Sequence, residues 1–535
     1  MKSQLKLWVF LGAFLMLLMG SKTAMANDVY IAQTGGGAGS SCSSPLAVSY
    51  FNTSTNWTSG APSGTKIGPG TTVHLCGTFT GTAGSTMLTA QGSGSAGNPI
   101  TIKFESGAVL TAPYWAHSVG GTQAGAITLG SGLSYITIDG GTNGIIQNTA
   151  NGSSFANQQP STGISAFLCS HCTVQNLTIS NLYVQVVGDA KLADNSVVRA
   201  VDFTGSNWSI NNNTIHDCGW CVMDSFSNGD SNVSIFSNNF YAFGHATAVA
   251  TSSANAITGV YIYGNHFHDP NNWADVGCNY HDDGLHAFGV TGSSIDQLYL
   301  YNNLFDGNWG TCPTGFVFVE AGGSGSPANL KNSYWWNNVM IVPLGSIENT
   351  NGWFNISSGN SGVQEVLNNT MVGPDATDNT NCMVFQNLSG LTFENNTVTN
   401  CGDPVYVTSS TLTSVDYNFY GPSCQNGNNC FVWNGSFTGS FSSWKSACAC
   451  DSHSYQNNTT GFASNGVPAA GSPVIGAGIN LISIATGSLA TLSSDTSLGN
   501  SRVPIARPST GAWDIGAYLS VGLTVAPSRL TAAPN

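Results

Sequence analysis

Positive charge is scarce in this chain. Only twelve of its 535 residues are Lys or Arg, against 26 Asp and Glu, and neither cation occurs between Arg199 and Lys331. Because binding to the phosphate backbone depends on such cations, we expect no nucleic-acid partner. Long apolar runs are also missing. The longest, Leu7–Met19, is too short to span a bilayer, so we expect no membrane partner after processing.

The first 26 residues have the pattern of a secretory signal. Lys2 and Lys6 precede the apolar run, and Ala24-Met25-Ala26 is typical of a cleavage site. We therefore predict a signal peptide over 1–26 and a secreted, extracellular or periplasmic protein. The mature chain would keep nine Lys and Arg against 26 acids, a formal charge of −17. Such a charge repels polyanions unless a cation intervenes.

Cysteine is not scarce. The fourteen Cys are even in number, which suits disulfides in an oxidising compartment. Local pairing is our hypothesis, because sequence alone does not prove connectivity. The expected pairs are Cys42 with Cys76, Cys169 with Cys172, Cys218 with Cys221, Cys278 with Cys312, Cys382 with Cys401, Cys424 with Cys430, and Cys448 with Cys450.

A short pattern recurs along the chain: alternating apolar residues, an Asn pair, then another apolar residue. By our alignment the second Asn of each copy falls at positions 213, 239, 265, 303, 338, 369 and 396. Alternation indicates strands, and a fixed period with loop-sized variation indicates a stacked repeat. Asn tolerates a left-handed bend, and stacked Asn side chains can hydrogen-bond along the stack. The pattern predicts an all-β parallel solenoid.

The chain reads as one continuous domain. We predict an N-terminal cap over 27–80, a parallel β-helix over 81–460 and a C-terminal cap over 461–535. Caps are expected because an open solenoid end exposes a strand edge and core. No segment has the length of a linker between independent domains, and we expect a monomer.

These motifs resemble the right-handed parallel β-helix proteins of the pectate-lyase-like superfamily. The Asn turns resemble the coils of that superfamily, Pro69–Leu75 resembles its first strand, and Ser472–Gly478 with Asp514–Tyr518 resembles its ending. The resemblance covers nearly the whole mature chain and implies a right-handed parallel β-helix with caps. It also implies a polysaccharide partner, for which the superfamily has lyases, hydrolases, epimerases and non-catalytic binders.

Aligning coils on a Gly that opens one strand predicts which side chains face outward. His245 is then expected inward, as a core histidine, and His286 outward, with small Ala246 beneath it. The Asn alignment predicts a second column in which His216 and His268 lie two coils apart, with Ala242 between them.

The segment His281-Asp282-Asp283-Gly284-Leu285-His286 concentrates the most chemistry. One interpretation is an acid and base for glycosidic hydrolysis, Asp282 and Asp283, assisted by His286 and His281. A second is a metal site, for Ca²⁺ through oxygens or for a transition metal through imidazole and carboxylate. The third is a polar turn without chemistry. Glu320 and Asp224 rank lower, as isolated acids.

Three functions stay open at this point. The first is a secreted glycoside hydrolase acting on a neutral or weakly charged glycan. The second is a polysaccharide lyase with a His base and bound Ca²⁺. The third is a non-catalytic carbohydrate-binding or adhesion protein. Asp282-Asp283-Gly284-Leu285 is similar to the paired-Asp segment of β-helix polygalacturonases, although the later Gly-His-Gly and Arg-Ile-Lys segments of that family are missing.

Further residues are predicted to bind the sugar chain. Exposed aromatic rings near the 270–283 loop could stack on sugars, although aromatic residues fill cores more often. The predicted substrate-binding residues are His216, His268, Asp217, Asp269, Trp273 and Phe288, with Tyr280 and Trp309 as further aromatic candidates.

Overall fold

The protein is described from a computed structural model. The structure describes residues 27–118, 122–151, 159–182, 198–227, 229–251, 256–270, 282–290, 292–310, 313–320, 329–342, 352–357, 362–377, 381–424, 430–457, 461–493 and 504–520. The predicted signal peptide, His281, Trp273, Tyr280 and the pair Cys278–Cys312 lie outside these residues. No helix among the described residues is long and apolar enough to cross a membrane.

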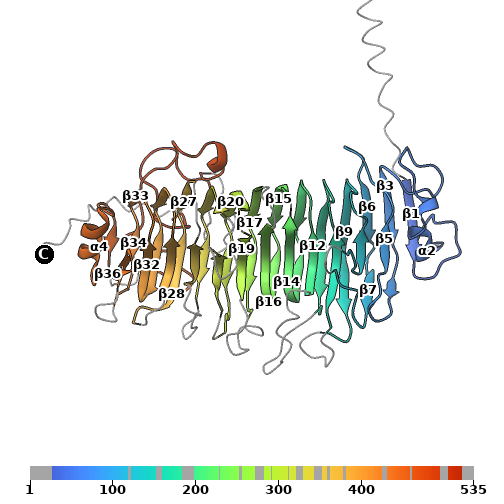
Figure 1. Ribbon diagram of the computed structural model, residues 1–535, viewed down its shortest axis with the longest axis horizontal. Coiled ribbons are helices and arrows are strands. Elements are labelled where there is room, and N and C mark those ends of the chain that lie inside the picture. The colour runs from blue at the N-terminus through green and yellow to red at the C-terminus, as the bar shows by residue number, and fades with distance from the viewer. Residues whose placement is uncertain are drawn as a thin grey trace, which may run out of the picture.

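The strands stack side by side along the long axis of the molecule, as Figure 1 shows. Each strand pairs with the equivalent strand of the next coil, and among the described strands only β35 (Val432–Trp433) and β36 (Ser436–Phe437) pair antiparallel. The predicted parallel β-helix is confirmed. Its coils form three faces, each a ladder of parallel strands.

The first face begins with β1 and carries most of the Asn pairs at its strand ends. Its strands are β1 (Asn27–Ala32), β3 (Thr71–Leu75), β6 (Ile100–Phe104), β9 (Ile136–Asn148), β11 (Thr173–Ser180), β13 (Trp208–Asn211), β15 (Ser231–Phe236), β17 (Ile257–Tyr263), β20 (Ser294–Tyr301), β24 (Ser333–Trp336), β27 (Gln364–Leu367), β30 (Leu391–Glu394) and β33 (Leu412–Asp416).

The second face follows the Asn turns and includes parts of the long strands β9 and β11. Its other strands are β4 (Thr78–Thr80), β7 (Val109–Ala112), β14 (Thr214–Ser227), β16 (Asn239–Thr251), β18 (His266–His268), β21 (Leu304–Asp306), β25 (Val339–Ile341), β28 (Thr370–Asp375), β31 (Thr397–Cys401), β34 (Phe419–Tyr420) and β37 (Tyr455–Gln456).

The third face includes the second halves of β14 and β16 and later carries the candidate site. Its other strands are β5 (Leu88–Ala90), β8 (Ile127–Leu129), β10 (Ser161–Ala166), β12 (Val198–Phe203), β19 (Asp283–Gly289), β22 (Gly315–Val319), β26 (Phe354–Ser357), β29 (Asn381–Gln386), β32 (Asp403–Thr408) and β35. The short pieces β2 (Leu46–Ala47) and β23 (Asn329–Leu330) pair with β1 and β20.

A ladder of buried Asn side chains runs along the bend between the first and second faces. Each rung's backbone N–H and side-chain NH₂ donate to the Oδ1 of the next Asn, at 2.9–3.2 Å. The ladder consists of Asn213, Asn238, Asn265, Asn303, Asn338, Asn369, Asn396 and Asn418. The predicted alignment is therefore wrong at one rung, where Asn238 and not Asn239 takes part.

The two roles expected of Asn, the left-handed bend and the hydrogen bonds along the stack, belong to two neighbouring residues. The residue before each ladder Asn takes the left-handed conformation, as at Asn212 (φ 54°), Asn302 (φ 54°) and Asn368 (φ 53°). Asn adopts this conformation more readily than most residues. The second residue is buried and hydrogen-bonded along the stack. This explains why the sequence repeats a pair of Asn rather than one.

The ends and one side of the solenoid carry the remaining elements. The helix α2 (Val48–Phe51) and the 3₁₀ turn η1 (Ser54–Asn56) lie at the N-terminal end, and α4 (Phe441–Cys448) lies at the other (Figure 1). Trp444 of α4 packs in the main core and so covers the last coil. Residues 461–493, with the 3₁₀ turn η3 (Gly487–Leu489), and residues 504–520 pack back over the coils, where Trp513 joins a cluster with Trp336 of the first face and Ile515 one with Phe419 of the second. The predicted domain boundaries stay a prediction.

Six of the seven predicted disulfides lie within the described residues and are formed. They join Cys42–Cys76, Cys169–Cys172, Cys218–Cys221, Cys382–Cys401, Cys424–Cys430 and Cys448–Cys450. The chain is therefore suited to an oxidising compartment.

Candidate functional site

On the third face the predicted alternation is confirmed for Leu285, His286 and Ala287, but it fails where two successive residues face inward. Cys221 and Val222 both pack in the main core, as do Phe316 and Val317. Two successive inward residues break strict alternation, so side chains before the break change sides relative to our prediction. The structure also pairs His286 with Ala248, not with Ala246, which packs in the core.

His245 is consequently not on the opposite side from His286. The two imidazole rings stack with centroids 5.1 Å apart, and His245 also stacks on Trp220 of the preceding coil at 4.6 Å. His245 is buried, as expected for a core residue, but it is buried among side chains on the outer surface of the sheet. The prediction that separated the two imidazoles is wrong.

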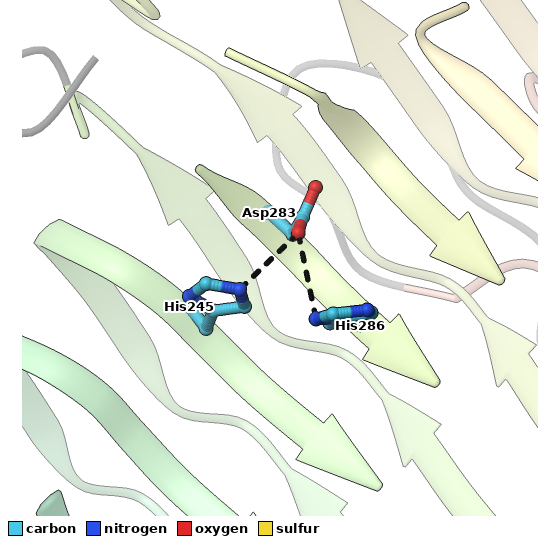
Figure 2. A group of neighbouring side chains, drawn as sticks. All are labelled: His245, Asp283 and His286. Atoms are coloured by element: carbon cyan, nitrogen blue, oxygen red, sulfur yellow. Dashed lines mark ion pairs between the residues drawn. The ribbon is translucent and has the colours of Figure 1, made fainter. Parts of the chain in front are cut away.

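Asp283 lies beside both imidazoles, and Figure 2 marks its ion pair with each of them. Its Oδ2 is 3.5 Å from Nε2 of His245 and 3.9 Å from Nδ1 of His286. Both distances exceed the normal range of a hydrogen bond, and neither oxygen of Asp283 accepts one within the described residues. The carboxylate and the two imidazoles face one another, but the Asp283 oxygen is too far from either nitrogen for a normal hydrogen bond.

The Asp283 carboxyl is fully buried. Burial raises its pKa well above the usual range, and the nearby charge of Glu320 raises it further. A buried carboxyl with a raised pKa is characteristic of functional sites, although buried structural groups show it too. Asp282 is equally buried but is not a member of this group of three. The predicted pairing of Asp282 with Asp283 as acid and base stays a prediction.

Glu320 completes the arrangement from the next coil. Its Oε2 is 3.4 Å from Nε2 of His286, and its side chain is 35% exposed. The His286 ring therefore has a buried carboxyl at one nitrogen and a half-exposed one at the other. In the sequence Glu320 is an isolated acid and therefore ranks low. It lies 34 residues after His286, and only the strand register brings the two side chains together.

Aromatic rings surround this group, which we call the His286 cluster: His245, Asp283, His286 and Glu320. Phe288 and Phe318 lie 4.5 and 5.1 Å from the His286 ring, and Trp220 lies 5.6 Å from Phe288. Trp220 and Phe288 are partly exposed. The predicted role of Phe288 in sugar binding stays a prediction. Trp309 is fully buried in the core, so the prediction that it stacks on sugar is wrong.

The His216 column forms a separate group. His216 stacks on Tyr241 at 4.3 Å, and Tyr241 stacks on His268 at 5.3 Å. The two histidines are two coils apart, as predicted, but Tyr241 and not Ala242 lies between them. The difference follows from the ladder rung at Asn238, which shifts the alignment by one residue.

The two acids of this column lie at a bend of the backbone and form contacts that stabilise it. Asp217 and Asp269 each accept from the Nδ1 of the preceding histidine at 2.7 Å. Both acids, with Ala242, have positive φ at a bend between the second and third faces. Hydrogen bonds to His268 and to the backbone N–H of Asn308 outweigh the effect of burial and lower the pKa of Asp269. These contacts fit a structural role, and sugar binding by this column stays a prediction.

Asp224 is also fully buried, and no hydrogen-bond partner reaches its oxygens by geometry within the described residues. Burial raises its pKa well above the usual range, and interactions with Asp230 and Asp202 raise it further. It pairs in register with the core residues Phe203 and Val249, and Val249 pairs with Ala287, so Asp224 lies two coils before the strand that carries His286.

A cavity of about 340 Å³ lies elsewhere, between the first face and the returning C-terminal segment. Its lining has no carboxyl group and no imidazole, and burial raises the pKa of one of its phenols, that of Tyr299, to about 12. The lining residues are Tyr261, Gln297, Tyr299, Tyr301, Trp336, Gly487, Ser488, Ala490 and Thr491. We therefore place the candidate site at the His286 cluster.

Metal binding is the other chemistry open to the cluster. Within the described residues His245, Asp283 and His286 are the only group of three or more metal-binding side chains with donor atoms close together. Two imidazoles and one carboxylate suit a transition metal, whereas Ca²⁺ prefers oxygen ligands. The predicted Ca²⁺ therefore finds no support at this group.

Comparison with known proteins adds little to this geometry. The sequence matches no protein-family model and no curated protein. The crystal structure of pectate lyase Pel9A is similar to this chain, with 15% sequence identity, 93% of this chain and 98% of that chain covered, and a TM-score of 0.35. The parallel β-helix is established here by the strand pairings themselves.

Proposed function

We propose that the protein is a secreted enzyme that cleaves glycosidic bonds of a polysaccharide by hydrolysis at the His286 cluster. The observation that carries the proposal is the position of Glu320, a half-exposed carboxylate beside His286 on the outer surface of the third face. A carboxylate in this position can exchange a proton with the glycosidic oxygen or with attacking water.

The surroundings of Glu320 support a sugar chain as the substrate. Trp220 and Phe288 offer partly exposed rings near the cluster, and aromatic rings provide large apolar contact surfaces. The third face continues through many coils on both sides of the site, so an extended polymer could lie along it. The scarcity of Lys and Arg favours a neutral or weakly charged glycan.

The test is a screen of the purified protein on a panel of neutral and acidic polysaccharides. Reducing ends and ultraviolet absorbance would be read in the same samples. Hydrolysis yields reducing ends without absorbance from an unsaturated sugar, whereas elimination yields both. Binding without product release would identify a non-catalytic protein and overturn the proposal.

A pair of matched variants assigns the reaction to the site. Glu320→Gln is expected to lower the cleavage rate by about 10²- to 10⁴-fold, the contribution of one proton-transferring group. Glu105→Gln is the control, because Glu105 also contacts a buried imidazole, that of His74, at the far end of the solenoid. Equal rates for the two variants would remove Glu320 from the reaction.

A further inference from the structure

Three donor atoms in the His286 cluster face one another. They are Oδ2 of Asp283, Nε2 of His245 and Nδ1 of His286, and Figure 2 marks the ion pair of the carboxylate with each ring. All the donor atoms of this group lie within 4.8 Å of one another, and all three side chains are buried. Asp283 accepts no hydrogen bond among the described residues, and a buried polar group without a hydrogen-bond partner can mark an ion that completes the site.

The cation that would balance Asp283 is missing from this part of the sequence. No Lys or Arg lies between Arg199 and Lys331, and Arg199 donates to Asp202 at 2.8 Å. Burying a carboxylate is costly unless a positive charge pairs with it. A bound cation would pair with the Asp283 oxygen and take the two facing nitrogens as further ligands.

The spacing is slightly wider than an occupied site requires. Donor atoms about 2.1 Å from one tetrahedral ion lie about 3.4 Å from each other. The Asp283 oxygen is already 3.5 and 3.9 Å from the two nitrogens, and the remaining pair, within 4.8 Å, would have to close by at most about 1.4 Å, which side-chain rotation can supply. The backbone already holds His245 and Asp283 in register on neighbouring strands.

We propose that His245, Asp283 and His286 bind a divalent transition-metal ion such as Zn²⁺. Two imidazoles and one carboxylate leave further coordination positions open, as in sites where a metal also binds water or substrate. The proposal goes beyond the proposed function and does not depend on it, because metal binding is measured without any glycan.

Glu320 supports the same assignment from behind His286. Metal-binding imidazoles usually donate their second N–H to a carboxylate, which fixes the ring orientation. With Nδ1 of His286 facing the metal position, Nε2 is the atom 3.4 Å from Oε2 of Glu320. Glu320 would thus be a positioning residue for the metal as well as the exposed carboxylate of the site.

The experiment is calorimetric titration of the chelator-treated, full-length mature protein with Zn²⁺, and with Ca²⁺ in parallel. Wild type is expected to bind one more equivalent of Zn²⁺ than either His245→Gln or Asp283→Asn, and Zn²⁺ is expected to raise its unfolding temperature. Co²⁺ in place of Zn²⁺ should give visible absorption bands that both variants lack. Glu320→Gln should weaken Zn²⁺ binding by about 10- to 100-fold.

The matched control is His74→Gln, because His74 is an equally buried imidazole between two carboxylates. It should bind Zn²⁺ like wild type. Far-UV circular dichroism and the metal-free unfolding temperature show whether each variant is folded. The proposal is overturned if folded His245→Gln and Asp283→Asn bind as many equivalents as wild type. It is also overturned if Ca²⁺, and not Zn²⁺, raises the unfolding temperature.

Discussion

Two buried histidines in this protein each lie between two carboxylates, and their surroundings differ. His74 has Asp28 3.1 Å from Nε2 and Glu105 2.6 Å from Nδ1, and both acids are partly exposed. His286 has Asp283 at 3.9 Å and Glu320 at 3.4 Å, and the Asp283 side chain is fully buried.

The comparison shows that composition alone does not make a site. The His74 contacts are short, and the ring also stacks on Tyr30 at 4.2 Å. The polar atoms of the His74 ring are satisfied by contacts within that group, which has the geometry of a structural contact. The His286 contacts are long, and Asp283 accepts no hydrogen bond among the described residues. A buried group that its neighbours do not satisfy has capacity left for a ligand.

The largest expected difference between the two groups is in activity. Asp283→Asn should lower glycan cleavage by about 10³-fold, because it removes a titratable carboxyl at the centre of the site. Asp28→Asn should leave the rate within about twofold of wild type. Initial rates of reducing-end release measure both. A large loss in Asp28→Asn would show that the His74 group also takes part.

A mutation outside both groups separates stability from activity. Asn303→Ala removes one rung of the Asn ladder, where Oδ1 accepts from the backbone and side chain of Asn265. It leaves buried donors unsatisfied and should lower the free energy of unfolding by about 3 kcal/mol. Chemical denaturation at 25 °C measures this loss. A change below about 0.5 kcal/mol would mean that the ladder contributes little.

The two histidine groups should also differ in stability, in the opposite sense to activity. Glu105→Gln weakens a short contact and should lower the free energy of unfolding by about 1 kcal/mol. Asp283→Asn replaces a buried carboxyl without hydrogen bonds and should not lower it in metal-free protein. Denaturation of both variants with chelator present makes the comparison. Marked destabilisation by Asp283→Asn would indicate a structural role.

The smallest expected effect concerns the ion pair between His453 and Asp416. Burial alone raises the pKa of Asp416, but hydrogen bonds from the side chain and backbone of His453 and the backbone of Tyr417 outweigh it and lower that pKa below 3.8. A lowered folded-state pKa stabilises the fold above the unfolded-state value, and this contribution disappears as pH falls through the folded-state value.

Wild type should therefore exceed Asp416→Asn in stability by under ~1 kcal/mol at pH 6, and the difference should vanish by about pH 2. Denaturation of both proteins at pH 6, 4 and 2 checks this. A difference that grows toward low pH would contradict the assigned direction.

The sequence predicts the fold better than the site because the two depend on different information. The Asn pairs and alternation recur in most coils between residues 209 and 396, so one misaligned rung at Asn238 leaves the predicted solenoid intact. The site depends on the register of three strands. It was predicted around His286, Asp283 and Phe288, but two consecutive inward residues in the third face put His245 beside His286, against the expected alternation.

Glu320 shows the same limit. No local motif marks it, and its contact with His286 arises only from pairing of β19 with β22 across a long insertion. If the predicted strand register had allowed two consecutive inward residues, the prediction would have placed both His245 and Glu320 near the motif at 281–286. The cysteines were easier, because all six described pairs join neighbours in sequence or in successive coils.

The most direct test replaces the two imidazoles themselves. His286→Gln and His74→Gln would be assayed side by side for reducing-end release on the polysaccharide that wild type cleaves fastest. The account predicts that His286→Gln loses at least about 10²-fold in rate and that His74→Gln retains the wild-type rate. Full activity in a folded His286→Gln variant would contradict the placement of the site.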